Sequence, residues 1–206
     1  MPRSADDTRR RILDAAESCF ATDGIVGATF ADILDAAGQR NNSAIQYHFG
    51  DRIGLLEAIT SRRVEQMAVH RDRLLDDLPS EPTVRDLVEV IIAPLAAMLG
   101  EPGGSAYLRI QAELLAHPNR DELPELLSQP WSRPGLERVQ ALLVESLPPH
   151  SVVLGAVRTV LATTLIFHSL ADRARLTDEA ADHEDFVRGL VHAVVAILET
   201  VMDEPA

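Results

Sequence analysis

The chain has 206 residues, of which 46% are hydrophobic, so it can bury a substantial core and is not a disordered chain. A single cysteine excludes an internal disulfide framework, and a net charge of −13 argues against a general nucleic-acid coat protein. Most of the acidity lies in residues 53–206, which carry −11, whereas residues 1–52 carry only −2.

The N-terminal residues and the longest apolar stretch do not have the pattern of a membrane protein. Residues 1–11 are polar and charged and lack the apolar core of a signal peptide. The longest apolar stretch, residues 152–167, is interrupted by Arg158 and is shorter than a membrane span. We therefore expect a soluble, cytoplasmic protein without a membrane partner; the single cysteine fits a reducing compartment.

Helical periodicity runs through almost the whole chain, and no segment shows the sustained alternation of a strand. The sequence therefore predicts an all-α protein. Apolar residues at helical spacing from Ile12 to Phe20 indicate the first helix, with Asp6 or Asp7 as its cap. Gly24 ends it, because glycine readily adopts the positive φ found beyond a helix end.

Two short helices are predicted next. Thr29 and Asp32 have the spacing of a capping box at the start of the second helix, which Gly38 ends. A polar stretch, residues 39–43, leads into a short third helix that ends near Phe49.

The remaining helices are longer and more apolar. Asp51 can cap a fourth helix that runs to Leu78. Thr83 and Asp86 repeat the capping box at the start of a fifth helix, inside which Pro94 predicts a kink. Further helices are expected over residues 105–117, briefly within 118–134, and over 135–147, 151–173 and 184–202.

The second and third predicted helices have the pattern of a helix-turn-helix, whose second helix lies in the major groove of DNA. Ala44, Ile45 and Phe49 would hold the third helix from inside. Asparagine and glutamine can pair with adenine edges, and arginine with guanine. The alternative is a solvated turn that happens to be polar. The candidates for base contacts are Arg40, Asn41, Asn42, Ser43 and Gln46.

Residues 8–56 resemble the N-terminal domain of the TetR family of bacterial repressors. The most specific part is Ala36-Ala37-Gly38, followed by Tyr47-His48-Phe49 and then by Leu55-Leu56 in the next helix. Other matching residues are Ile12, Leu13, Ala15, Ala16, Phe20, Gly24, Thr29, Asp32 and Ile33.

The chain departs from the family pattern in three ways. Gly38 to Phe49 spans eleven positions, where the family pattern has ten, so the turn or the start of the third helix holds one extra residue. Gln46 stands where the family has a tyrosine, and Arg52 where it has a lysine. These differences concern the base contacts rather than the class of protein.

The resemblance also implies roles for individual residues. By position, Thr29 would cap the second helix and contact a phosphate, while Tyr47, His48 and Arg52 would hold backbone phosphates. The alternative for Tyr47 and His48 is packing against the first helix.

The resemblance implies a DNA-binding domain over residues 1–50 and a ligand-sensing and dimerisation domain over residues 51–206. The last two helices would form the interface of a homodimer that reads a palindromic operator in double-stranded DNA. The alternative is that both are internal core helices. The fourth helix joins the two domains and would transmit the effect of a ligand.

A small-molecule effector of unknown identity would bind between the middle helices, because bundle interiors commonly hold such sites. His168 could equally be an ordinary core histidine. The candidate ligand-binding residues are Leu95, Met98, Tyr107, Gln111, Trp131, Phe167 and His168.

The sequence thus predicts a transcriptional regulator, a repressor that its ligand releases from DNA. An enzyme is the first rival, but no two of the seven histidines are three or four positions apart, and no phosphate-binding glycine loop is present. Cys19 falls on the buried face of the first helix. We expect no catalytic residue, metal or cofactor. The second rival is a helical protein-interaction adaptor without specific DNA binding.

Overall fold

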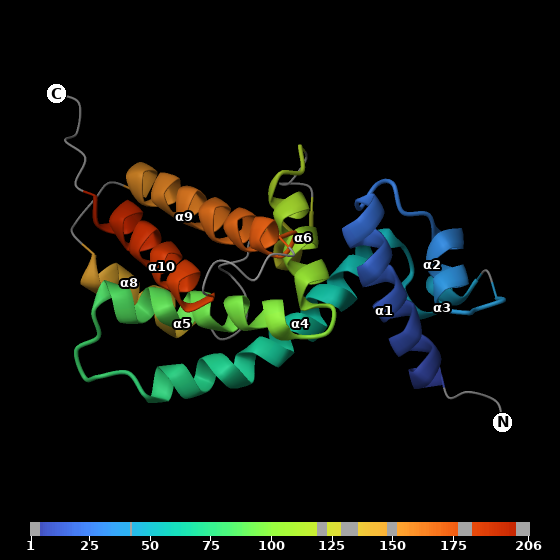
Figure 1. The fold of residues 1–206 in the computed structure, drawn as a ribbon, viewed down its shortest axis with the longest axis horizontal. Coiled ribbons are helices and arrows are strands. Elements are labelled where there is room, and N and C mark those ends of the chain that lie inside the picture. Colours follow the sequence, from blue (N-terminus) through green and yellow to red (C-terminus); the bar gives the residue numbers. More distant parts are fainter. Residues whose placement is uncertain are drawn as a thin grey trace.

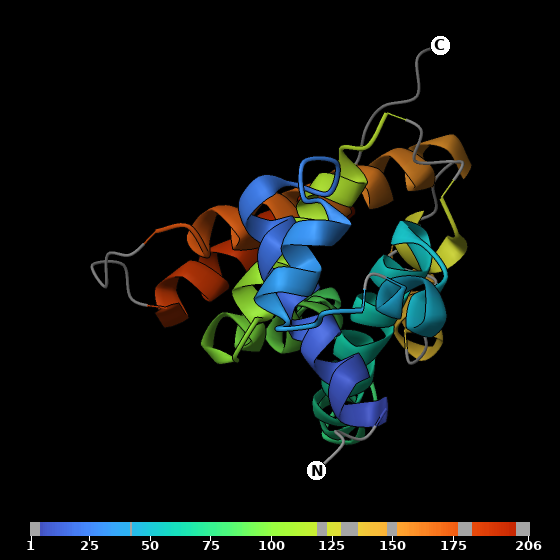
Figure 2. The ribbon, with the colours of Figure 1, turned by 90° about the vertical axis from the view of Figure 1, so that its right-hand side faces the viewer.

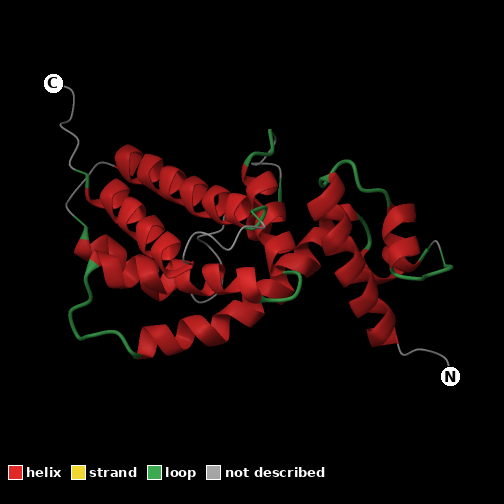
Figure 3. Ribbon diagram, viewed as in Figure 1, coloured by secondary structure: helices red, strands yellow, loops and turns green. Residues whose placement is uncertain are grey.

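The computed structural model describes residues 5–41, 43–118, 123–128, 136–147, 152–176 and 183–200. Within those ranges every regular element is a helix, which confirms the predicted fold class (Figure 3). The elements are α1 (Ala5–Asp23), α2 (Phe30–Ala36), α3 (Ala44–Phe49), α4 (Arg52–Asp76), α5 (Val84–Ala97), the 3₁₀ turn η1 (Met98–Gly100), α6 (Gly104–Leu115), α7 (Glu125–Ser128), α8 (Glu137–Ser146), α9 (Val152–Arg173) and α10 (His183–Glu199).

The helices form two parts that share α4 and α6. Figure 1 shows α1, α2 and α3 at one end of the molecule and α5, α8, α9 and α10 at the other. The long α4 runs from one part to the other and packs against α1, α3 and α5. Helix α6 packs against both α1 and α9. Seen along the long axis, the three N-terminal helices stand in front of the bundle (Figure 2).

The first helix follows its predicted pattern with one correction. Ile12, Ala16 and Phe20 are fully buried, as their spacing predicts. Gly24 adopts φ 81° just after the helix ends. The expectation that Asp6 or Asp7 caps the helix is wrong, because the helix begins at Ala5 and both aspartates lie inside its first turn. There they still favour the helix, since negative charge is stabilising near a helix N-terminus.

Both predicted capping boxes are present. The Thr29 hydroxyl accepts the Asp32 backbone N–H at 3.2 Å, and the Asp32 carboxylate accepts the Thr29 backbone N–H. Thr83 and Asp86 make the same pair of contacts at the start of α5. Each box satisfies backbone donors that a helix N-terminus otherwise leaves free. These two residue pairs therefore fix where α2 and α5 begin.

Helix α9 has nearly the bounds that its sequence predicted. By length and composition alone, Leu154–Arg173 could cross a membrane, because this helix extends beyond the apolar stretch of residues 152–167. In the structure α9 packs against α6 and α10, and Ile166 and Leu170 are buried. Core helices of soluble proteins meet the same length and composition criteria, so these criteria alone do not identify a membrane helix.

Candidate nucleic-acid interface

The turn between α2 and α3 is built on Gly38. Helix α2 closes with hydrogen bonds from Gly38 N to Asp35 O and from Gln39 N to Leu34 O, both 2.8 Å long. Gly38 has φ +59°, which L side chains rarely adopt. A Cβ at this position would also lie 2.6 Å from Nη2 of Arg11 on α1. Glycine therefore allows both the turn and the close approach of α1.

Helix α3 is held from inside by apolar side chains. Ala44 and Ile45 are buried, and Phe49 is half-buried beneath the Arg9 guanidinium, which lies 5.2 Å from the ring centroid. Just before the helix, Asn41 Oδ1 accepts the Ser43 backbone N–H at 3.0 Å and so orders the turn. This confirms the prediction that Ala44, Ile45 and Phe49 hold α3 from inside.

The opposite face of α3 is exposed. Arg40, Asn41, Ser43 and Gln46 are all exposed to solvent, and Asn42 lies outside the described residues. The Tyr47 side chain is 81% exposed, so the alternative that Tyr47 packs against α1 is wrong. The half-buried His48 ring makes an edge contact with the Tyr47 ring, with 4.9 Å between the centroids.

The Thr29 hydroxyl is already engaged within the protein. It donates to Asp32 Oδ2 and accepts the Asp32 backbone N–H. Hydrogen bonds from the Thr29 hydroxyl, and then from its backbone N–H, lower the pKa of the Asp32 carboxyl, which is therefore negative at neutral pH. Thr29 caps α2 as predicted, but the predicted phosphate contact would have to be made beside this carboxylate.

Arg52 has a role that the sequence did not reveal. Its Nη1 donates to the carbonyl oxygens of Ile25 and Ala28, and its guanidinium lies over the rings of Phe20 and Phe30. The side chain is half-buried and ties the start of α4 to the loop between α1 and α2. Nη1 of Arg52 therefore has an internal structural role, and the phosphate contact expected of Arg52 stays a prediction for the rest of its guanidinium.

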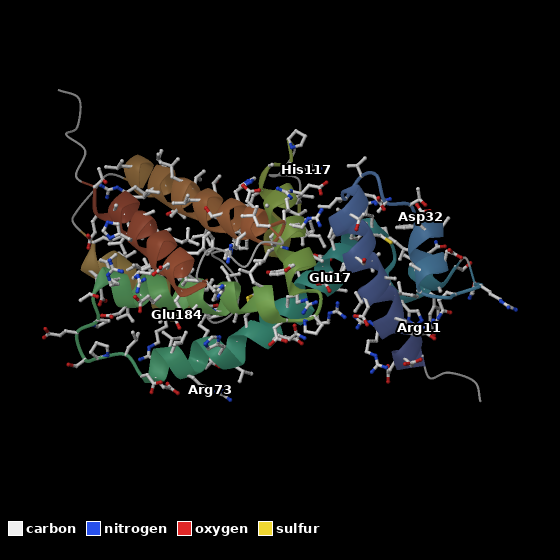
Figure 4. The ribbon with its side chains drawn as sticks, in the orientation of Figure 1. Arg11, Glu17, Asp32, Arg73, His117 and Glu184 are labelled. Atoms are coloured by element: carbon white, nitrogen blue, oxygen red, sulfur yellow. The ribbon has the colours of Figure 1, made fainter. Side chains whose placement is uncertain are left out.

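A buried ion-pair cluster joins the N-terminal helices to the rest of the chain, and sequence reasoning missed it. Arg63 on α4 hydrogen-bonds Glu17 on α1 through Nε at 2.7 Å and Nη2 at 2.5 Å (Figure 4 labels Glu17). The same Nη2 donates to the Pro102 carbonyl oxygen at 2.8 Å, just before α6. Glu17 was detectable, because an acid stands within the apolar stripe of the first helix.

A second connection runs from α6 to the loop between α1 and α2. Glu113 Oε1 accepts the Ile25 backbone N–H at 2.8 Å. Helix α6 therefore contacts the N-terminal part through its own carboxylate as well as through the loop that precedes it.

Comparisons with known proteins define the fold. No protein-family model matches the chain. The solved TetR-family regulator PfmR from Thermus thermophilus superposes with a TM-score of 0.53 at 17% identity, covering 94% of this chain and 100% of PfmR. Bacillus subtilis FadR, solved with stearoyl-CoA, gives 0.51 at 19% identity, covering 91% of this chain and 97% of FadR. The chain has the TetR-family fold.

A curated relative agrees with this assignment. The transcriptional repressor AcnR of Corynebacterium glutamicum is 37% identical over 108 residues, which are 52% of this chain and 49% of AcnR. The chain spans about half the length of the curated relatives it matches. The predicted resemblance to the TetR family is thus confirmed at the level of the fold.

The predicted ligand-binding residues lie mostly in the core of the protein. Leu95, Met98, Tyr107 and Phe167 are buried, whereas His168 is only half-buried. Gln111 is also fully buried, and its Nε2 donates to Thr60 Oγ1 on α4 at 3.2 Å. Trp131 lies outside the described residues. Three cavities lined by described residues have other linings, at α8–α9–α10, α4–α8 and α4–α5–α10.

Proposed function

We propose that the protein is a sequence-specific DNA-binding transcriptional regulator whose α3 enters the major groove. The observation that carries this proposal is a short helix with a buried apolar side, Ala44 and Ile45, and a solvent-exposed polar side at one end of the molecule. A groove-reading helix needs this division of its surface. The repressor name of AcnR supports the repressor assignment.

The residues proposed to contact DNA divide into two groups. Base edges would be read from the turn and α3, where polar side chains are exposed, by Arg40, Asn41, Asn42, Ser43 and Gln46. Tyr47 and His48 would contact phosphates from the end of α3. Thr29 and Arg52 hold α2 and the α1–α2 loop in place, and each would also contact a phosphate.

We further propose a homodimer with α9 and α10 at its interface. Helix α9 exposes the large apolar residues Val157, Val160 and Leu161, whose side chains are 47–53% exposed. A cluster of exposed apolar side chains on a helix is typical of a protein interface. Two copies would then present two α3 helices to a palindromic operator, at half-sites about one helical turn apart or a multiple of it. In this proposal residues 1–50 form the DNA-binding domain and residues 51–206 the sensing and dimerisation domain.

The proposed signal is a small-molecule effector that releases the operator. FadR, which shares this fold, was solved with stearoyl-CoA, which supports a ligand-accommodating helical domain. The Arg63–Glu17–Pro102 contacts and the Glu113–Ile25 contact connect that domain to the helix-turn-helix. Displacement of α6 by an effector would therefore move the α1–α2 loop and, through it, α2 and α3. Coupling of about 1–3 kcal/mol is usual for allosteric proteins.

We propose a cytoplasmic protein that is not an enzyme. Within the described part of the chain, no group of three or more His, Cys, Asp and Glu side chains is placed to hold a metal ion. Burial, followed by the charges of Asp23 and Asp32, raises the pKa of the Cys19 thiol. A thiol with a raised pKa is a poor nucleophile at neutral pH.

Selection from a random DNA pool tests the proposal directly. The purified full-length protein should enrich one palindromic site, and binding to this site should weaken with rising salt. The Gln46→Ala variant, carried through the same selection, should relax the preference at one position of each half-site. Enrichment of no palindrome by the folded wild-type protein would favour the protein-interaction adaptor.

A further inference from the structure

A cavity of about 310 Å³ lies among α8, α9 and α10, away from α3 and from the predicted effector residues. Its walls are largely apolar, with Leu143, Leu147 and Leu198 among them. Among the described residues of its lining, Arg158 from α9 is the one charged side chain. Ligand pockets in proteins start at about 300 Å³, so this cavity suits a small ligand.

Within the described part of the chain, the buried Arg158 has no charged partner. Arg158 is only 4% exposed to solvent. Nη2 donates to the Thr200 carbonyl oxygen at the end of α10, whereas Nε and Nη1 have no hydrogen-bond partner. None of the carboxylates in the described ranges forms an ion pair with Arg158. Burial of an unpaired charge is strongly unfavourable, so an anion bound here would be stabilised.

We propose that this cavity binds a small apolar carboxylate. The carboxylate would accept hydrogen bonds from Arg158 Nε or Nη1, and the hydrocarbon body would pack against Leu143, Leu147 and Leu198. A charge-assisted hydrogen bond supplies affinity, and the apolar wall supplies the preference for a hydrocarbon body. A fully hydrated anion such as inorganic phosphate would leave that wall unmatched.

This site lies apart from the helices that are proposed to contact DNA. None of its lining residues belongs to α1, α2 or α3, so it can be tested with the full-length protein alone. Failure of the DNA proposal would leave it unaffected, and its own failure would leave the DNA proposal unaffected.

The first experiment compares octanoate with octanamide, a neutral molecule of nearly the same shape, by calorimetric titration and thermal unfolding of the full-length protein. Octanoate should bind at least about tenfold more tightly than octanamide, because only the carboxylate pairs with Arg158. At about ten times its Kd, octanoate should raise Tm by about 3–5 °C. Equal binding of the two molecules would overturn the proposal. Absence of octanoate binding would overturn it as well, and would be expected if a carboxylate of a second copy of the chain fills the cavity.

Variants then locate the site. Arg158→Met should weaken octanoate binding by about tenfold or more, and Arg158→Lys should restore part of it. Arg175→Met is the matched control, because it removes the same charge from an exposed side chain just beyond the end of α9. Equal losses in the Arg158 and Arg175 variants would contradict the site. If Arg158→Met does not fold, the octanoate–octanamide comparison and Arg158→Lys decide the matter.

Discussion

Arg63 and Glu17 form a two-point ion pair across the junction of α4 and α1, and both residues are almost completely buried. Burial acts to lower the pKa of Arg63, but its hydrogen bond to Glu17 and the charge of Glu17 outweigh this and raise it. The neighbouring Gly103 has φ +74°, and a Cβ there would lie 2.2 Å from Arg63 Nη2. The loop before α6 thus closes over the ion pair because residue 103 has no side chain.

Breaking this pair should be costly. Glu17→Gln leaves the buried Arg63 without a countercharge, and we expect a loss of about 3–5 kcal/mol in the free energy of unfolding. Asp14→Asn is the matched control: Arg62 pairs with both Glu17 and Asp14, but the Asp14 side chain is 61% exposed. That variant should cost less than about 1 kcal/mol. Urea denaturation measures both, and equal losses would show that burial does not decide the effect.

The two capping boxes allow a comparison within one molecule. Thr29→Ala and Thr83→Ala should each cost about 1 kcal/mol of stability, because each removes one N-cap hydroxyl. Thr29→Ala should also weaken operator binding, because Thr29 begins the first helix of the helix-turn-helix. Thr83→Ala should leave operator binding unchanged, because Thr83 begins α5. A gel-shift titration of both variants checks this, and parallel losses of DNA affinity would point to a global effect of stability.

The aspartate carboxylates of the two capping boxes should make the stability of the protein depend on pH. Thr29 and Thr83 lower the pKa values of the Asp32 and Asp86 carboxyls below their usual 3.8. The contribution of these two carboxylates to the free energy of unfolding is therefore complete above pH 3.8. It is lost as the pH falls through their lower pKa values in the folded state. Asp32→Asn should lower the urea midpoint at pH 7, and the deficit should shrink at acid pH. Carboxyl titration by NMR provides the direct reading, and an Asp32 pKa at or above 3.8 would contradict the prediction.

Gln46 is the most accessible test of base reading. Gln46→Ala should reduce affinity for the selected operator by about 1–3 kcal/mol, the scale of one lost base contact. Asn42→Ala is expected to have an effect of the same size. Gln140→Ala on α8 serves as the control, because it makes the same substitution in the other part of the molecule. Unchanged operator affinity in Gln46→Ala would remove Gln46 from the reading set.

Arg52 should behave as a structural residue. Arg52→Met removes two hydrogen bonds to the carbonyl oxygens of Ile25 and Ala28, and we expect a loss of about 1–3 kcal/mol in stability. Arg40→Met, in contrast, alters an exposed side chain and should affect DNA affinity without affecting stability. The salt dependence of DNA binding separates the two roles. If Arg52→Met reduces the slope of log affinity against log salt concentration by about one unit, Arg52 contacts a DNA phosphate as well.

Local sequence signals predicted most of the helices correctly. The Thr29–Asp32 and Thr83–Asp86 boxes and the Gly24 and Gly38 turns depend on residues only a few positions apart, so spacing alone reveals them. The inward anchoring of α3 by Ala44 and Ile45 follows from the same short-range pattern.

The contacts between distant segments were beyond such reasoning. Arg63 and Glu17 are 46 positions apart, and nothing in either local segment identifies the other as its partner. Arg52 was assigned to DNA because its position matched a family pattern, and its acceptors in the α1–α2 loop could not be foreseen from that pattern. Arg158 was interpreted only as an interruption of an apolar stretch, because its cavity needs three helices to form.

The peptide groups at Ile25 connect two helices to one short loop. Glu113 of α6 accepts its N–H, and Arg52 at the start of α4 donates to its carbonyl oxygen. A movement of α6 along α4 would therefore pull this single residue in two directions at once. The Ile25 amide would therefore report the relative position of α4 and α6. Its hydrogen-exchange rate and its chemical shift should change whenever a bound molecule moves one of these helices against the other.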